Sequence, residues 1–81
     1  MSNDFDIQLT IGLVEDGTQT RAAVILGLAG KQFEGVGLAR RSPGDPSVPE
    51  VGEELATSRA MSDLAHQLLE AATERIEHFE G

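Results

Sequence analysis

The first half of the chain alternates apolar with polar or small residues at a period of two, which is typical of a half-buried β-strand. The alternation predicts a strand over residues 4–14 and a second strand over residues 18–28. The apolar positions of the first strand are Phe5, Ile7, Leu9, Ile11 and Leu13. Those of the second are Ala22, Val24, Leu26 and Leu28.

A tight turn is expected between these two strands. Asp16-Gly17 is a preferred pair for a type I′ turn, in which both central residues need positive φ. A two-residue loop at this pair places Ile11 opposite Ala22. Both apolar sets then lie on one side of an antiparallel hairpin, as a one-faced core requires.

A third strand is expected over residues 32–40, and its register is open. A three-residue loop over 29–31 puts Val36 and Leu38 on the core face. A two-residue loop over 30–31 instead puts a set containing two glycines there. That set is Phe33, Gly35, Gly37 and Ala39.

The second half of the chain reads as a loop followed by a long helix. Residues 41–49 contain three prolines and one glycine, which predicts a loop. From about 50 to 79 the apolar residues recur with helical spacing along one half of the helical wheel. They are Met61, Leu64, Ala65, Leu68, Leu69, Ala72, Ile76 and Phe79. The chain is therefore expected to be one α+β domain, residues 1–81, with a three-stranded antiparallel sheet packed on one long C-terminal helix (β-β-β-α).

Composition adds a reason to expect self-association. A chain of 81 residues builds only a thin core, and without cysteine it has no disulfide to reinforce that core. The polar, acidic N-terminus lacks the features of a signal peptide, and no apolar run is long enough to span a membrane. We therefore expect a cytoplasmic protein with no membrane partner.

No constellation in the sequence indicates catalysis, so we expect no enzyme activity, small-molecule substrate, cofactor or metal. His66 and His78 are twelve residues apart on one helix, about 18 Å along its axis, and cannot share a metal ion. Ser62, Asp63 and His66 have the residue types of a nucleophilic triad, but on one exposed helix surface they lack an oxyanion hole.

Two groups of residues are candidates for binding. Fourteen acidic against six basic residues give a net charge of −8, which argues against non-specific nucleic-acid binding, although a local basic patch could still contact RNA. The candidate basic residues are Arg21, Lys31, Arg40, Arg41 and Arg59. The other group is a smooth, partly apolar sheet face that would suit a dimer contact in the longer-loop register. Its residues are Ala23, Ile25, Gly27, Phe33, Gly35, Gly37 and Ala39.

Three segments carry a resemblance to a known family. They are Gly35-Val36-Gly37-Leu38-Ala39-Arg40, Val48-Pro49-Glu50-Val51-Gly52-Glu53-Glu54-Leu55-Ala56 and Arg59-Ala60-Met61-Ser62-Asp63-Leu64. The chain resembles small actinobacterial proteins of unknown function labelled double-stranded-RNA-binding-domain-like. That family includes a mycobacterial member associated with hypoxia and dormancy. The resemblance implies a β-β-β-α fold, a homodimer and a likeness to ribosome hibernation factors.

The chain departs from the wider double-stranded-RNA-binding family in two respects. It lacks that family's first helix, and it lacks the lysine cluster that grips phosphates at the start of the last helix. Residues 50–54 are acidic instead and would repel phosphate. The leading hypothesis is a dimeric, stress-linked accessory protein with a ribosome or rRNA contact. The alternative is a protein-interaction module with no nucleic-acid role.

Overall fold

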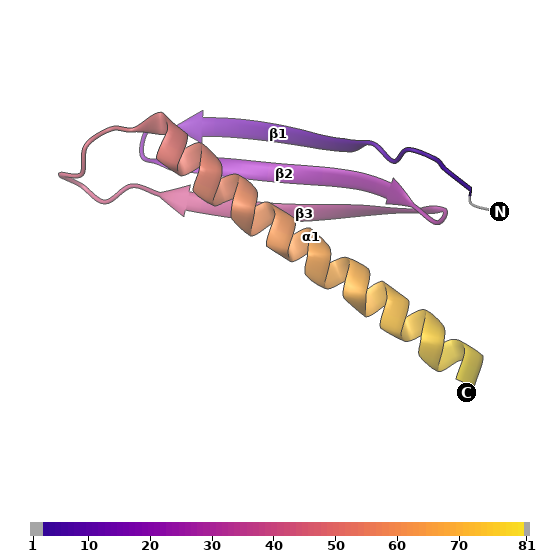
Figure 1. Cartoon of the computed structure of the whole chain (residues 1–81). Coiled ribbons are helices and arrows are strands. Elements are labelled where there is room, and N and C mark those ends of the chain that lie inside the picture. The colour runs from indigo at the N-terminus through magenta and orange to yellow at the C-terminus, as the bar shows by residue number, and fades with distance from the viewer. Residues whose placement is uncertain (1–2, 81) are drawn as a thin grey trace.

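The computed structural model describes residues 3–80 and contains three strands and one helix (Figure 1). The strands form one antiparallel sheet in the order β1-β2-β3. The α+β fold and the β-β-β-α order are therefore confirmed. The elements are β1 (Leu9–Asp16), β2 (Gln19–Leu28), β3 (Lys31–Arg40) and α1 (Pro49–Glu80). β1 begins five residues later than the alternation predicted.

The turn between β1 and β2 lies one residue further along than predicted. Asp16 pairs with Gln19, so the loop is Gly17-Thr18 and not Asp16-Gly17. Gly17 has φ +59°, the positive value that a glycine adopts at little cost. Ile11 lies opposite Val24, two positions from the predicted Ala22, and this even shift keeps the predicted apolar face.

The turn between β2 and β3 decides which face of β3 meets the helix. Leu28 pairs with Lys31, so the loop is Ala29-Gly30 and differs from both predicted loops. Both loop residues have positive φ, +54° and +77°, as a type I′ turn requires. The core face of β3 is the one that the shorter predicted loop gave: Phe33, Gly35, Gly37 and Ala39.

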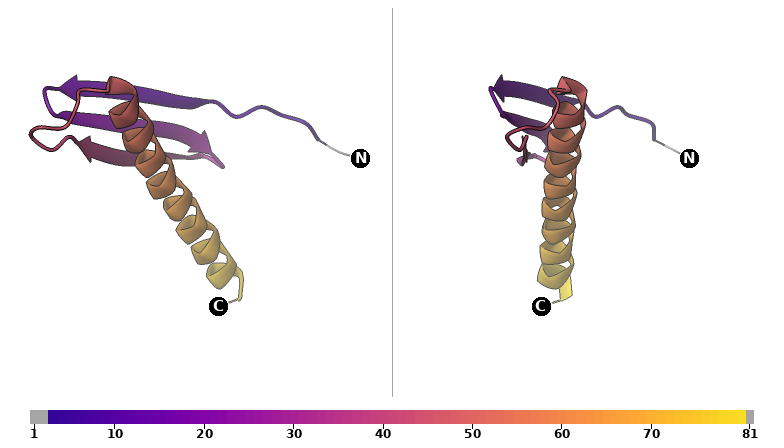
Figure 2. Two further views of the ribbon diagram at one scale, coloured as in Figure 1. Left: turned by 60° about the vertical axis from the view of Figure 1, so that its left-hand side comes forward. Right: turned by 90° about the vertical axis from the view of Figure 1, so that its left-hand side faces the viewer.

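Helix α1 crosses one face of the sheet diagonally, and its C-terminal half extends past the sheet (Figure 1; Figure 2). The buried core beneath it is made mostly of small side chains, and Val24 is the largest that is fully buried. Its members are Ala22, Val24, Leu26, Ala39, Ala56, Ala60 and Leu64.

The small residues bring the helix backbone into direct contact with the backbone of β3. A Cβ atom at Gly35 would lie 2.7 Å from the amide nitrogen of Leu64. A Cβ atom at Gly37 would overlap the carbonyl oxygen of Ala56 and the amide nitrogen of Ala60. Because these neighbours are backbone atoms, they cannot move aside without moving the helix.

Polar side chains of α1 also bind the free edge of β3. Asp63 Oδ2 accepts a hydrogen bond from the Val36 amide at 2.8 Å. Arg59 donates to the Leu38 carbonyl at 2.6 Å, and Gln67 donates to the Glu34 carbonyl at 2.7 Å. The donors and acceptor on the helix are four residues apart and therefore share one flank of it. We call Arg59, Asp63 and Gln67 the edge ladder.

We expect Gly37→Ala to destabilise the fold by about 1–3 kcal/mol, because the new methyl group overpacks the helix–strand contact. Chemical denaturation followed by circular dichroism measures this change. Gly27→Ala is the matched control, since a Cβ atom there meets nothing within 4 Å. If the two variants unfold at the same denaturant concentration, backbone contact at Gly37 does not limit the helix position.

A second prediction concerns the edge ladder and pH. The Val36 amide hydrogen bond, and after it the Gln67 side chain, lower the pKa of Asp63 below its ordinary value of 3.8. A lowered folded-state pKa gives stability that is present above the unfolded value and is lost as pH falls through the folded value. We therefore expect Asp63→Ala to lower the free energy of unfolding at pH 7 and to cost progressively less below pH 3.8.

Asp63→Asn is the control for this experiment, because its amide oxygen still accepts the Val36 hydrogen bond but does not titrate. It should retain part of the stability lost in Asp63→Ala. Denaturation midpoints of the three proteins between about pH 2 and pH 7, a range that includes the titration of such a carboxylate, provide the measurement. A loss in Asp63→Ala that stays constant with pH contradicts the role of the charged carboxylate.

Candidate interaction surfaces

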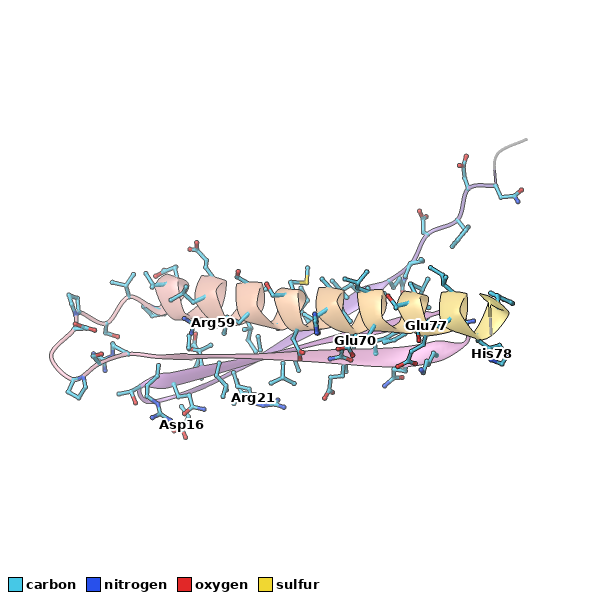
Figure 3. All side chains as sticks on the ribbon, turned by 90° about the horizontal axis from the view of Figure 1, so that it is seen from below. Asp16, Arg21, Arg59, Glu70, Glu77 and His78 are labelled. Carbon is cyan, nitrogen blue, oxygen red and sulfur yellow. The ribbon has the colours of Figure 1, made fainter. Side chains whose placement is uncertain are left out.

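The sheet face opposite α1 is not covered by any element in residues 3–80. We call it the outer sheet face. It consists of residues 10, 12, 14 and 16 of β1, residues 19, 21, 23, 25 and 27 of β2, and residues 32, 34, 36, 38 and 40 of β3. In Figure 3 the side chains of Asp16 and Arg21 project from this face, on the side of the sheet away from the helix.

Two of the predicted basic residues lie together on the outer sheet face. Arg21 pairs with Leu38 and Gln19 pairs with Arg40, so the two arginines occupy neighbouring rows. Such diagonal neighbours are about 7–8 Å apart. Arg40 Nη2 donates to Gln19 Oε1 at 3.2 Å, which holds its guanidinium across the end of the sheet. We call Arg21 and Arg40 the arginine pair.

The other three predicted basic residues are elsewhere. Arg41 Nη1 donates to the Asp45 carbonyl at 2.9 Å within the proline-rich loop. Arg59 belongs to the edge ladder on α1. Lys31 lies at the opposite end of β3, with its ammonium 5.8 Å from the Phe33 ring centre on the helix side. The five residues therefore do not form one patch.

The predicted dimer face is also divided by the structure. Ala23, Ile25 and Gly27 lie on the outer sheet face, as predicted. The four residues expected from β3 lie on the other face, against α1, so their assignment to the dimer face was wrong. Gly35, Gly37 and Ala39 are buried there and Phe33 is half-buried. The physical reason is the β2–β3 loop, whose length selects the face of every residue in β3.

At the end of the sheet that carries the arginine pair, the helix side is acidic. Desolvation of its carboxylate, and then the nearby Glu15, raise the pKa of Glu53 above its ordinary value, with Glu50 and Glu54 adding smaller repulsions. A cleft of about 480 Å³ lies beside them, between the proline-rich loop and the first turns of α1. Its lining includes Glu15, Thr20, Arg41, Gly52 and Leu55. The acidic groups would repel an anion approaching from the helix side.

The apolar row of β1 is exposed, although the alternation assigned it to the core. α1 lies over β2 and β3, and all eight residues of β1 are exposed. Leu9, Ile11 and Leu13 on the helix side are between 37% and 45% exposed. Sequence periodicity placed these residues on the correct face but could not show that the helix fails to cover them.

The residue types considered for catalysis are engaged elsewhere or exposed. Asp63 is part of the edge ladder, and His66 Nε2 lies 3.0 Å from Glu70 Oε1 on the exposed helix surface. In residues 3–80 no three His, Cys, Asp or Glu side chains are grouped as a metal site would need. Over the same residues, no helix is both long and apolar enough to cross a membrane.

The edge ladder was missed from the sequence. The only signal was the four-residue spacing of Arg59, Asp63 and Gln67, which read as an ordinary solvated helix face. Their backbone partners on β3 could not be identified before the crossing of helix and sheet was known.

Comparison with known proteins places this chain among mycobacterial relatives. It is 46% identical over 70 residues to the uncharacterized protein Rv2632c of Mycobacterium tuberculosis (strain ATCC 25618 / H37Rv), covering 86% of this chain and 75% of the relative. It is 45% identical over 67 residues to the uncharacterized protein Mb1767 of Mycobacterium bovis (strain ATCC BAA-935 / AF2122/97), covering 83% and 71%.

A solved structure and a family model agree with these relatives. The crystal structure of Rv2632c superimposes with a TM-score of 0.89 at 42% identity, covering 95% of this chain and 92% of that one. The family model described as Rv2632c-like matches residues 5–81. The chain belongs to the Rv2632c-like family.

Proposed function

We propose that this protein is a dimeric accessory protein of stress or dormancy that acts by binding and not by catalysis. Its target is the ribosome, with the arginine pair contacting rRNA phosphates. In this proposal the RNA contact lies on a different surface from the one that the double-stranded-RNA-binding family uses at the start of its last helix.

The arrangement of charge at one end of the sheet carries the proposal. The arginine pair lies on the outer sheet face, while Glu15, Glu50 and Glu53 lie on the helix side of the same end. A phosphate is attracted to the first surface and repelled from the second. In this proposal the outer sheet face contacts the ribosome, and the start of α1 does not.

The overall charge of −8 is consistent with a small and specific contact. General repulsion between an acidic protein and RNA suppresses non-specific binding, because the phosphate backbone supplies most of that affinity. A guanidinium group binds phosphate through two parallel hydrogen bonds. A contact made by two arginines can therefore be both strong and specific in its geometry.

The alternative function is supported by the apolar part of the outer sheet face. Val14 and Leu38 are 62% and 48% exposed and flank Arg21 in one row across the sheet. Arginine is enriched in protein interfaces, and their buried centre is more apolar than the rest of the surface, so this row of an arginine between two aliphatic residues suits a protein contact. The alternative is a protein-interaction module without an RNA contact.

Sedimentation of stressed-cell lysate through sucrose gradients tests the proposal. We expect the wild type to migrate with ribosomal fractions at low salt and to leave them as salt rises. Arg21→Glu/Arg40→Glu should lose this association. With purified ribosomes, neutral replacement of each arginine should reduce the slope of log affinity against log salt by about 1.

The control is Lys31→Glu/Arg75→Glu, which makes the same charge change at the other end of the sheet. Arg75 donates to the Ala29 carbonyl at 3.4 Å, so both control residues lie near the β2–β3 turn. Equal loss in both double variants contradicts a site at the arginine pair. A wild-type protein that stays at the top of the gradient at both salt concentrations contradicts the ribosome target and leaves the protein-interaction alternative.

A further inference from the structure

We propose that the cleft beside the start of α1 binds a small primary aliphatic amine, whose ammonium group is held between Glu15, Glu53 and Thr20. The cleft has a volume of about 480 Å³ and lies between the proline-rich loop and the first turns of the helix. The inference goes beyond the ribosome contact and does not depend on it, because that contact uses the arginine pair on the opposite face of the sheet.

The floor of the cleft is one row of residues across the sheet. Glu15 pairs with Thr20, and Thr20 pairs with Ala39, so the three side chains share one face. Ala39 is buried against α1, which makes this the helix side. All three residues line the cleft. Directly opposed residues of antiparallel strands have Cβ atoms about 4.5–5.5 Å apart, so the Glu15 carboxylate and the Thr20 hydroxyl are neighbours.

The hydroxyl group of Thr20 lacks a partner inside the protein. Thr20 is 8% exposed, yet no hydrogen bond within residues 3–80 reaches its Oγ1 atom. Over the same residues, every fully buried side-chain nitrogen or oxygen atom has a hydrogen-bond partner. The Oγ1 atom is therefore not sealed in the core. Its remaining accessible surface opens into the cleft that Thr20 lines.

The first turns of α1 bring a second carboxylate to the same place. A Cβ atom at Gly52 would lie 2.8 Å from Thr20 Oγ1, so the glycine leaves the hydroxyl group uncovered. Glu53 is the next residue, and its carboxyl group lies within hydrogen-bonding reach of Glu15. Two carboxylates and one hydroxyl group, contributed by β1, β2 and α1, thus converge at one end of the cleft.

These three oxygen-bearing groups suit an ammonium ion. Desolvation, and after it the charge of Glu15, raise the pKa of Glu53, as expected for carboxylates whose charge no nearby cation balances. A primary ammonium has three N–H donors and no acceptor, so it can donate one hydrogen bond to each of the three residues. A metal ion suits them less, because in residues 3–80 no third His, Cys, Asp or Glu joins the pair as a ligand set.

The charges around the cleft also favour a cation. Arg41 Nη1 donates to the Asp45 carbonyl at 2.9 Å, and the Arg40 guanidinium is bonded on the outer sheet face. Glu50 and Glu54 add negative charge beside Glu53 on the first turns of α1. The potential at the converging oxygens is therefore negative, so that a cation is attracted and an anion is repelled.

The rest of the cleft suits an aliphatic chain. Val48, Val51 and Leu55 line it and are between 44% and 53% exposed. Val51 and Leu55 are four residues apart on α1, so they form one flank that extends about 6 Å along the helix axis. A short alkyl chain spans this flank. A mostly apolar cleft with a few convergent polar groups is typical of a small-molecule site.

NMR titration of the full chain with pentylamine tests the inference. We expect saturable shifts of the backbone amides of Thr20, Gly52 and Leu55, and none at Gly27 near the other end of the sheet. Pentanol and pentanoate keep the alkyl chain and replace the ammonium with a neutral or a negative group. They should bind about tenfold more weakly or worse, because hydrogen bonds between charged groups are roughly twice as strong as neutral ones.

Two variants test the residues that hold the ammonium. Glu53→Gln keeps the size of the side chain and should weaken pentylamine binding about tenfold. Its control, Glu77→Gln on the exposed end of α1, should leave binding unchanged. Gly52→Ala should also weaken binding, because the new methyl group covers the Thr20 hydroxyl. Alanine favours helix over glycine, so this loss cannot be attributed to unfolding of α1. Gly27→Ala is the matched control, since its Cβ atom meets nothing within 4 Å.

Each outcome decides the proposal without reference to the ribosome experiment. Pentylamine shifts around Thr20 and Gly52 that Glu53→Gln reduces support it. Equal responses to pentylamine, pentanol and pentanoate indicate an apolar cleft only and overturn the ammonium site. The absence of shifts at millimolar pentylamine overturns the site altogether. Nα-acetyl-lysine methylamide carries the same ammonium on a peptide backbone. If it binds and pentylamine does not, the occupant is a lysine side chain of a protein, which overturns the assignment to a small amine.

Discussion

The close approach of α1 to β3 determines the rest of this structure. Gly35 and Gly37 remove two side chains from the strand, and Ala56 and Ala60 reduce those of the helix, so that backbone meets backbone. Glycine in a strand gives up side-chain packing and conformational stability. That cost is offset only where another backbone occupies the vacated space. The helix is therefore held against the strand that carries the glycines, so that it covers β3 and β2 and leaves β1 exposed.

Because the helix lies nearer to β3 than to β1, the two edges of the sheet differ. Near β3 the helix is close enough for the edge ladder to bind the outward backbone groups, which removes that edge from intermolecular pairing. Near β1 the same helix is too far away to cover the apolar row. The core that remains is small, with Val24 as its largest fully buried side chain.

The division of the molecule into faces also separates its charges. Successive side chains of β2 and β3 point to opposite faces of the sheet. The arginine pair therefore lies on the outer sheet face and the small core residues lie on the helix side. The acidic first turns of α1 then cover the helix side of the same end. An acidic protein can in this way present a local cationic site on its outer sheet face.

The sequence by itself determined the elements, their order and the antiparallel sheet, because periods of two and 3.6 residues are local properties of strands and helices. It also identified the correct face of β1 and β2, since a register error of two residues does not change which face a side chain occupies. Only the tertiary structure decided the face of β3. A change of one residue in the length of the β2–β3 loop moves every side chain of that strand across the sheet. Only the tertiary structure also showed that Leu9, Ile11 and Leu13 are exposed and that the edge ladder binds β3. Both features depend on where the helix axis crosses the sheet. That position is set by contacts between residues distant in the sequence.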